Sequence, residues 1–245
     1  MQSPEGFRFE PNPPELHHLF GEDHQWLWPD EDESLAGDLP TLLDLDNHVL
    51  PAVSLRIAKL GEEEAVVPSV CVQAGGAIGA WPKRLSMFFD HVYTFEPYPP
   101  SFRCLAHNAP ELNVHKYNAA LGAKHGTATM DFPEHRARSA TGKENIGGFR
   151  VVGEGDVPVL TIDDLYLNAR VDLIMLDLEG FEKFALEGAS RTIDEYRPIV
   201  VLEDKPGCCE TFGYKVGDCE KMLISQFGYR SARRFHGNRD VMVLP

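Results

Sequence analysis

The 245-residue sequence has no apolar run long enough to cross a membrane, and its first ten residues, MQSPEGFRFE, lack the apolar segment of a signal peptide. Its five cysteines, at positions 71, 104, 208, 209 and 219, are too few and too irregularly spaced for a disulfide framework or a CxxC zinc site. We therefore expect a cytoplasmic protein with reduced thiols and no membrane contact.

Basic residues are also scarce, and the charge imbalance is concentrated at one end of the chain. The net charge is −15, with 23 Lys and Arg residues against 38 Asp and Glu residues. Residues 1–68 hold 15 acids and 3 bases, a net charge of −12, whereas residues 69–245 hold 23 acids and 20 bases, a net charge of −3. Neither part offers the basic face that nucleic acids require, so no nucleic-acid partner is expected.

Composition divides the chain into a leading extension and one main domain. We predict that residues 1–48, which are acidic and rich in proline, form an N-terminal extension, and that residues 49–245 form the domain. Aromatic residues such as Trp26 and Trp28 argue that part of the extension packs instead of staying fully disordered. A helix is expected over residues 49–60.

The stretch from 69 to 97, SVCVQAGGAIGAWPKRLSMFFDHVYTFEP, has the pattern of a nucleotide-binding βαβ unit. A strand rich in β-branched residues stops at Gly75 and Gly76, a helix follows, and a second strand ends at Glu96. Glu96 lies 21 positions after Gly75, near the spacing at which an acid binds the two hydroxyls of a ribose. The alternative is a turn whose glycines serve packing, with Glu96 as a solvated surface acid.

The glycine pattern discriminates between nucleotides. A dinucleotide fingerprint G-x-G-x-x-G begun at Gly75 would need glycines where Ala77 and Ala80 stand, so an NAD-linked oxidoreductase is disfavoured. S-adenosylmethionine has a ribose but no phosphate, so the looser turn of Gly75, Gly76 and Gly79 is enough to border it.

Strands and helices alternate along the rest of the domain, which predicts an α/β fold. VDLIMLDLEG and RPIVVLEDK have the apolar runs of central parallel strands buried on both faces. YRSARRFHG and RDVMVLP are expected to pair antiparallel at the end of the chain. The prediction is a Rossmann-like, doubly wound, mostly parallel sheet with an antiparallel C-terminal strand.

Four acids, Glu96, Asp177, Glu179 and Glu203, lie at or just past the carboxyl ends of predicted strands, where open sheets bind ligands. Burying charge without a ligand is costly, so their convergence favours a site. The alternatives are that Asp177 and Glu179 cap the following helix and that Glu203 pairs with Lys205.

In these segments the chain resembles the FkbM-type methyltransferases, a family of S-adenosylmethionine-dependent O-methyltransferases. VQAGGAIG is similar to the family's VDVGANIG turn, and the later matches, in the family's order over roughly residues 69–205, are VYTFEPYPPSFRCLAHN, NAALG, LTIDDL, VDLIMLDLEGFEKFALEGA and IVVLE. D-x-E-G-x-E, residues 177–182, is the most specific, and the GGFR that follows Asn145 resembles the family's Asn-and-Gly loop. Residues 1–48 and the C-terminal pair have no counterpart in the resemblance.

The resemblance implies a class I methyltransferase fold and a set of cofactor-binding residues. The glycines of the turn would line the methionine end of S-adenosylmethionine, and Glu96 would hold its ribose. Asn118 and Ala119 would lie near the adenine. The predicted cofactor-binding residues are Gln73, Gly75, Gly76, Gly79, Glu96, Asn118, Ala119 and Asp177.

On the acceptor side, the resemblance implies that Asp177 and Glu179 are catalytic and face the methyl group and a hydroxyl acceptor, which is a small molecule or a glycan such as a sugar. Asn145, Glu179 and Glu203 are the predicted substrate-binding residues. In a class I sheet the strands that end at Asp177 and Glu203 lie side by side, so these two carboxylates can share a proton or bind a divalent cation such as Mg²⁺.

One departure from the family pattern is Gln73, which stands where the family usually has Asp. An acid would attract the ammonium group of the cofactor, whereas the neutral Gln would weaken binding by about 1–2 kcal/mol. The alternative function is therefore an S-adenosylmethionine-binding module of methyltransferase fold with weak or no turnover. The sequence leaves the oligomeric state open.

Overall fold

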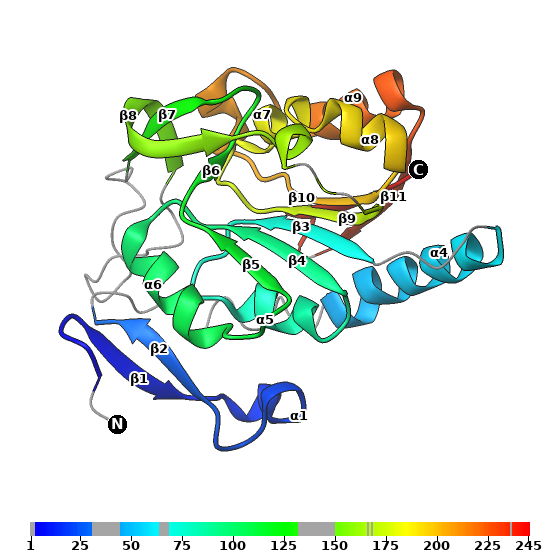
Figure 1. Cartoon of the computed structure of the whole chain (residues 1–245). Coiled ribbons are helices and arrows are strands. Elements are labelled where there is room, and N and C mark those ends of the chain that lie inside the picture. The colour runs from blue at the N-terminus through cyan, green and yellow to red at the C-terminus, as the bar shows by residue number, and fades with distance from the viewer. Residues whose placement is uncertain are drawn as a thin grey trace.

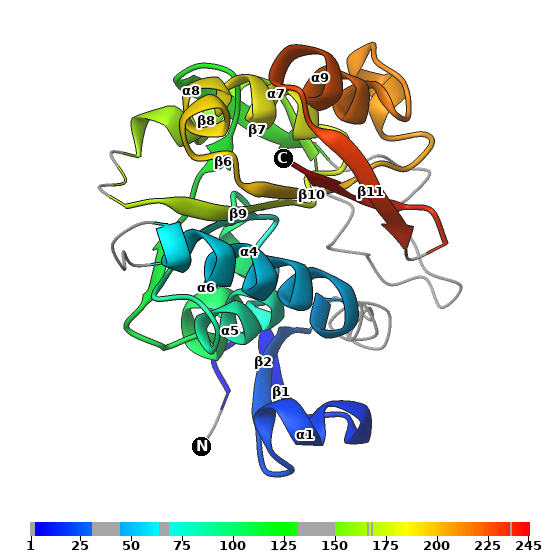
Figure 2. The same ribbon diagram turned by 90° about the vertical axis from the view of Figure 1, so that its right-hand side faces the viewer.

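The structure is a computed structural model that describes residues 3–30, 45–63, 69–131, 150–165, 167, 169–235 and 237–245. A central sheet carries helices on both faces, which gives three layers (Figures 1 and 2). One face is covered by α4 (Leu50–Glu63), α5 (Ala80–Ser86) and α6 (Pro99–Asn108). The other face is covered by α7 (Glu182–Glu187), α8 (Ser190–Tyr196) and α9 (Asp218–Phe227).

In the part of the chain that the structure describes, the main sheet has seven strands in the order β11-β12-β10-β9-β3-β4-β5. Their bounds are β3 Val70–Ala74, β4 His91–Phe95, β5 Val114–Tyr117, β9 Val171–Leu176, β10 Ile199–Glu203, β11 Arg230–Phe235 and β12 Asp240–Leu244. Neighbours from β10 to β5 pair in parallel, whereas β12 is antiparallel to β10 and β11. The predicted doubly wound sheet with an antiparallel C-terminal strand is confirmed.

The strand order reverses between β3 and β9. From β3 the chain builds outward through β4 to β5, and it then returns to place β9 on the other side of β3. In open α/β sheets the ligand binds at such a reversal, beyond the carboxyl ends of the strands. The topology therefore puts the glycine turn after β3 and the acids after β9 at the expected ligand position.

The central strands owe their burial to their apolar sequence. Every residue of β3, β9 and β10 is buried. Alternate residues point to opposite faces, so Val72 and Ile174 join the core beneath α7–α9, while Cys71 and Leu173 join the core beneath α4 and α5. This two-sided burial is the pattern predicted for central parallel strands.

Two segments of the domain are each divided between two elements. NVHKYNAALG forms β5 and then β6 (Ala120–Leu121), which belongs to a separate sheet of order β6-β8-β7 with β7 (Gly126–Asp131) and β8 (Arg150–Leu160). FEKFALEGASRTIDEY is broken at Gly188 into α7 and α8. A Cβ atom at Gly188 would lie 2.1 Å from the Gly122 carbonyl oxygen. The missing side chain of Gly188 therefore lets these two backbones meet.

The N-terminal segment forms a hairpin of β1 (Phe7–Pro11) and β2 (Gln25–Pro29), joined by η1 (Pro14–Leu16) and α1 (His17–Phe20). It lies on the outer side of α5 and α6 (Figure 2). Trp26 and Trp28 are fully buried there against Ile78, Ala80 and Cys104, which confirms that the aromatic residues of this segment pack. The division into an extension of residues 1–48 and a domain of residues 49–245 stays a prediction.

The predicted helix over 49–60 is present as α4, preceded by one π-helical turn, η2 (Leu45–Val49). No helix within the described ranges is long and apolar enough to cross a membrane. All five cysteines are buried, and all are present as thiols. The cytoplasmic location stays a prediction.

Candidate active site

The glycine turn after β3 is tied to both neighbouring strands. The N–H groups of Gly75 and Gly76 both donate to the carbonyl of the last residue of β4, at 3.0 Å each. Gly75 has a φ of +83°, and a Cβ atom there would lie 2.0 Å from the Asp177 carbonyl oxygen. A Cβ atom at Gly76 or Gly79 would meet atoms of Leu105 on α6. Packing therefore requires these glycines, and their contact with a cofactor stays a prediction.

Gln73 holds this turn from inside the protein. Its Nε2 donates to the Gly75 carbonyl oxygen at 2.9 Å, and its Oε1 accepts a hydrogen bond from the Thr94 hydroxyl. The side chain is only 1 % exposed. An aspartate could not donate to Gly75, so the departure from the family pattern changes the local bonding as well as the charge.

Glu96 follows β4 and bends back toward the glycine turn. Its Oε2 accepts from the Ala77 N–H and its Oε1 from the Tyr98 N–H, both at 2.8 Å. The residue is 7 % exposed, so the alternative of a solvated surface acid is wrong. Burial raises the pKa of Glu96 to about 7, although the two N–H groups act in the opposite direction.

Asn118 links the ends of β4 and β5. Its Nδ2 donates to the Glu96 carbonyl oxygen at 2.8 Å and to the Pro97 carbonyl oxygen at 3.2 Å. Ala119, next in the chain, is 4 % exposed and belongs to the core. Asn118 thus lies beside the predicted ribose acid, and the proximity of both residues to adenine stays a prediction.

The strands that end at Asp177 and Glu203 lie side by side, as predicted. Oxygens of Asp177, Glu182 and Glu203 lie within 4.8 Å of one another. The Asp177 carboxylate is open to solvent on one side and makes no hydrogen bond or ion pair with any residue that the structure describes. The surrounding protein still displaces much of the water from the Asp177 carboxylate. This desolvation, together with the charges of Glu203 and Glu179, raises the pKa of Asp177 well above its usual value.

Lys205 forms ion pairs with both Glu179 and Glu203. Its Nζ donates to Glu179 Oε1 and Glu203 Oε1, both at 2.9 Å, and lies 2.8 Å from Glu203 Oε2. Arg239 also donates to Glu203 Oε1, at 2.8 Å. Although burial acts in the opposite direction, the charges of Glu203 and Glu179 raise the pKa of Lys205 above its usual value. The predicted alternative for Glu203, pairing with Lys205, is confirmed.

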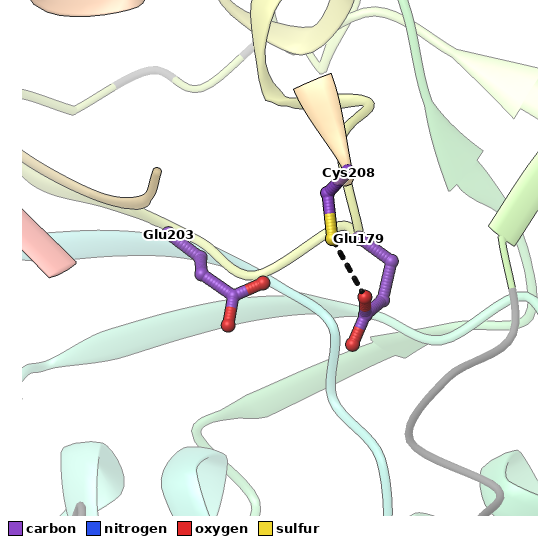
Figure 3. Close-up of side chains that lie close together, drawn as sticks. All are labelled: Glu179, Glu203 and Cys208. Atoms are coloured by element: carbon purple, nitrogen blue, oxygen red, sulfur yellow. Dashed lines mark hydrogen bonds between the residues drawn. The ribbon is translucent and has the colours of Figure 1, made fainter. Parts of the chain in front are cut away.

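Glu179 is held in an unusual backbone conformation at the centre of the edge. Its φ is +53°, a left-handed value that is costly for a residue with a side chain. Its Oε2 lies 3.2 Å from Cys208 Sγ (Figure 3). A Cβ atom at the next residue, Gly180, would lie 2.5 Å from the Cys208 carbonyl oxygen. The glycine of the D-x-E-G-x-E motif thus lets the Cys208 backbone approach Glu179.

Glu182, the last acid of this motif, fixes the turn that carries Glu179. Its Oε1 accepts from the Leu178 N–H at 2.7 Å and the Gly180 N–H at 3.3 Å, and the Tyr214 hydroxyl donates to its Oε2 at 3.1 Å. Burial raises the pKa of Glu182 to about 7. These two turn N–H groups bind Glu182, and α7 has no side-chain cap. The alternative that Asp177 and Glu179 cap the helix is therefore wrong.

Four residues that stabilise the site were not among the predicted site residues. Lys205 entered the sequence analysis only as an alternative partner of Glu203, and Glu182 only as part of a motif. Cys208 gave no local pattern by which its contacts were identifiable. Neither did Asn108, whose side chain bonds to the backbone of Leu27 and Ile78 next to the glycine turn. Asn145, by contrast, was predicted to bind substrate, and it lies outside the described residues.

A divalent cation would meet competition in this site. Glu179, Glu203 and Cys208 also offer ligand atoms within 4.8 Å of one another (Figure 3). Lys205 already pairs with two of these three residues. A magnesium ion would have to displace its ammonium group, and magnesium binding by Asp177 and Glu203 stays a prediction.

The arrangement fits a nucleoside that carries an amino acid. The Glu96 carboxylate lies beside the glycine turn that follows β3. Each of its oxygens can accept a further hydrogen bond from a ribose hydroxyl. The backbone of Gly75 and Gly76 crosses the strand ends between Glu96 and the unpaired carboxylate of Asp177. The residues therefore suit S-adenosylmethionine, with Glu96 for the ribose and Asp177 near the methionine part.

Solved structures with a similar fold include several methyltransferases. An FkbM methyltransferase from Methylobacillus flagellatus KT is 18 % identical, with a TM-score of 0.48, over 73 % of this chain and 44 % of that chain. A TehB-like S-adenosylmethionine-dependent methyltransferase from Corynebacterium glutamicum is 14 % identical, with a TM-score of 0.40, over 84 % and 98 %. The N-methyltransferase NodS from Bradyrhizobium japonicum WM9, in complex with S-adenosyl-L-homocysteine, is 10 % identical, with a TM-score of 0.39, over 82 % and 88 %.

The chain thus spans less than half of the Methylobacillus structure. Among curated proteins, none matches it significantly. A family model described as the methyltransferase FkbM domain matches residues 74–231, which is more than half of the chain and confirms the resemblance drawn from the motifs. With the strand order and the matched motifs, this shows that the chain belongs to the FkbM family of S-adenosylmethionine-dependent methyltransferases.

Proposed function

We propose that this chain transfers a methyl group from S-adenosylmethionine to a hydroxyl group of a small molecule or glycan, such as a sugar. The observation that carries the proposal is the Glu179 carboxylate, held by Lys205 and Cys208 next to the unpaired carboxylate of Asp177. A positioned carboxylate base is what removal of a hydroxyl proton requires.

The cofactor part of the proposal uses the β3 and β4 ends. When bound, S-adenosylmethionine supplies a methyl group on a sulfonium centre. Glu96 would bind the ribose, with its position fixed by the N–H groups of Ala77 and Tyr98. Asn118 keeps the ends of β4 and β5 together beside it. Such fixed positions favour transfer, because an in-line displacement needs the reacting atoms close and aligned.

The acceptor part uses the β9 and β10 ends. With S-adenosylmethionine bound, the acceptor oxygen would form a bond to the methyl carbon as the carbon–sulfur bond breaks with its electron pair on sulfur, and Glu179 would take the acceptor proton. Lys205 holds the Glu179 carboxylate in place through their ion pair. Glu203 anchors Lys205 and completes the predicted substrate side with Asn145. Asp177 lies against Gly75, on the cofactor side of this pair.

The test is a screen for transfer of a deuterated methyl group to sugars, glycans and small alcohols, read by mass spectrometry. We expect labelled O-methyl product, and we expect Glu179→Gln to lower turnover by about 10²–10⁴ while S-adenosylhomocysteine still binds. Asp194→Asn, on the exposed side of α8, removes a matched charge away from the site and should leave turnover unchanged.

Two results would contradict this function. Transfer to nitrogen alone would exclude a hydroxyl acceptor, and full turnover by Glu179→Gln would exclude this residue as the base. Cofactor binding without transfer to any acceptor would instead favour the alternative suggested by Gln73, a binding module that has lost turnover.

A further inference from the structure

We propose that Asp177 binds the α-ammonium group of the cofactor in this chain, in place of the acid that Gln73 replaces. The inference rests on the proposed function, because it requires S-adenosylmethionine in this site. It assigns Asp177 to cofactor recognition and leaves proton removal to Glu179.

Gln73 is poorly suited to bind an ammonium group. Its side chain is neutral and 1 % exposed. Its oxygen already accepts from Thr94, and its nitrogen donates to Gly75. An ammonium group has only donors, and the one acceptor of Gln73 is a neutral oxygen that already accepts from Thr94, so it offers a single remaining lone pair and no negative charge.

Asp177 occupies the adjacent strand end. Its N–H donates to the Ala74 carbonyl oxygen at 3.0 Å, which fixes it beside the last residue of β3. Its Cβ atom would lie 3.4 Å from a Cβ atom placed on Gly75. Asp177 and Gln73 therefore both adjoin Gly75 in the glycine turn, but Gln73 is buried whereas Asp177 is exposed to solvent.

Asp177 is also the acid that remains available at this edge. Among the described residues there, the other acids have partners: Glu96 and Glu182 bind backbone N–H groups, and Glu179 and Glu203 pair with Lys205. Asp177 has an exposed carboxylate without such a partner. Its neighbours Glu203 and Glu179 add negative charge to its surroundings, which further favours a cation.

The test compares two ligands by isothermal titration calorimetry with the full chain. One is S-adenosylhomocysteine, which has the ammonium group but no sulfonium charge, and the other is its analogue without the α-amino group. We expect the wild type to bind S-adenosylhomocysteine about 10- to 100-fold more tightly than the analogue, the range for a hydrogen bond to a charged group. In Asp177→Asn this preference should fall to near unity, whereas the matched surface variant Asp194→Asn should keep it.

Two further variants sharpen the assignment. Asp177→Ser provides a second neutral residue and should also lose the preference. Gln73→Asp, made in the Asp177→Asn background, returns an acid to the family position and should restore it. Circular dichroism spectra of all variants establish that the comparison is made on folded protein.

The outcomes separate this inference from the proposed function. A wild type that binds S-adenosylhomocysteine without preference over the analogue would overturn the inference alone. A preference for S-adenosylhomocysteine that is retained in both Asp177 variants would also overturn the inference. A preference that is lost in Gln73→Ala would do the same, because the ammonium group would then be bound by Gln73. A wild type that binds neither ligand would contradict the proposed function, and the inference would fall with it.

Discussion

Glu96 makes opposite contributions to folding and to cofactor binding as the pH changes. In the folded protein burial raises its pKa from 4.5 to about 7. The folded state therefore binds the Glu96 proton more tightly than the unfolded chain does. Its contribution to stability is fully present below about pH 4.5 and is lost as the pH rises through 7.

The size of the effect follows from the two pKa values. At about 1.4 kcal/mol for each pKa unit, complete ionisation of Glu96 would cost about 3 kcal/mol of unfolding free energy. Water entry and small side-chain movements reduce such costs, so we expect about 1–3 kcal/mol. Glu182 also has a pKa of about 7 and contributes with the same sign, so the effect must be measured as a difference between proteins.

The assay is urea unfolding of the wild type and Glu96→Gln at pH 5 and pH 8, without ligand. We expect the wild type to lose about 1–3 kcal/mol more unfolding free energy than the variant between these pH values. Asp194→Asn, with its exposed carboxylate, is the matched control and should follow the wild type. An equal pH dependence in the wild type and Glu96→Gln would refute the raised pKa.

Binding should change in the other direction. Ribose hydroxyls donate hydrogen bonds and favour the ionised carboxylate, so the affinity of the wild type for S-adenosylhomocysteine should increase as the pH rises through 7. Glu96→Gln should bind about 10- to 100-fold more weakly at pH 8, the value of hydrogen bonds to a charged group. An affinity that is unchanged by the substitution would remove Glu96 from the ribose role.

Two further predictions concern the glycine turn and the hairpin packed beneath it. Buried Asn108 bonds to the Leu27 N–H and carbonyl and to the Ile78 carbonyl, so Asn108→Ala should cost about 2–4 kcal/mol in urea unfolding and weaken S-adenosylhomocysteine binding. Unchanged stability would show that this residue does not hold the hairpin. Ala77 has a φ of +43°, so Ala77→Asn should raise the unfolding free energy by about 0.5–1 kcal/mol. A lower melting temperature would contradict that expectation.

The sequence by itself determined the positions of the strands and of the acids that follow them. Nearly continuous apolar runs mark β3, β9 and β10, because a parallel strand that is buried on both faces consists mostly of apolar residues. Glu96, Asp177 and Glu203 could be placed at one edge because parallel strands present their carboxyl ends together. The strand positions depend on neighbouring residues in the chain, and the shared edge of the acids depends on general sheet topology. Both could therefore be predicted from the sequence.

Only the tertiary structure decided how those acids are used. Lys205 lies between Glu179 and Glu203 because β9 and β10 bring their following loops together, and among the described residues this leaves Asp177 without an ion-pair partner. Gly75 is required by a backbone that lies 102 positions later in the chain, at Asp177. The Lys205–Glu179 and Gly75–Asp177 contacts join residues far apart in sequence, whereas the pairing of Lys205 with Glu203, two positions away, was already an alternative in the sequence. The pKa values follow from the resulting burial and charge, so no local pattern could have shown them.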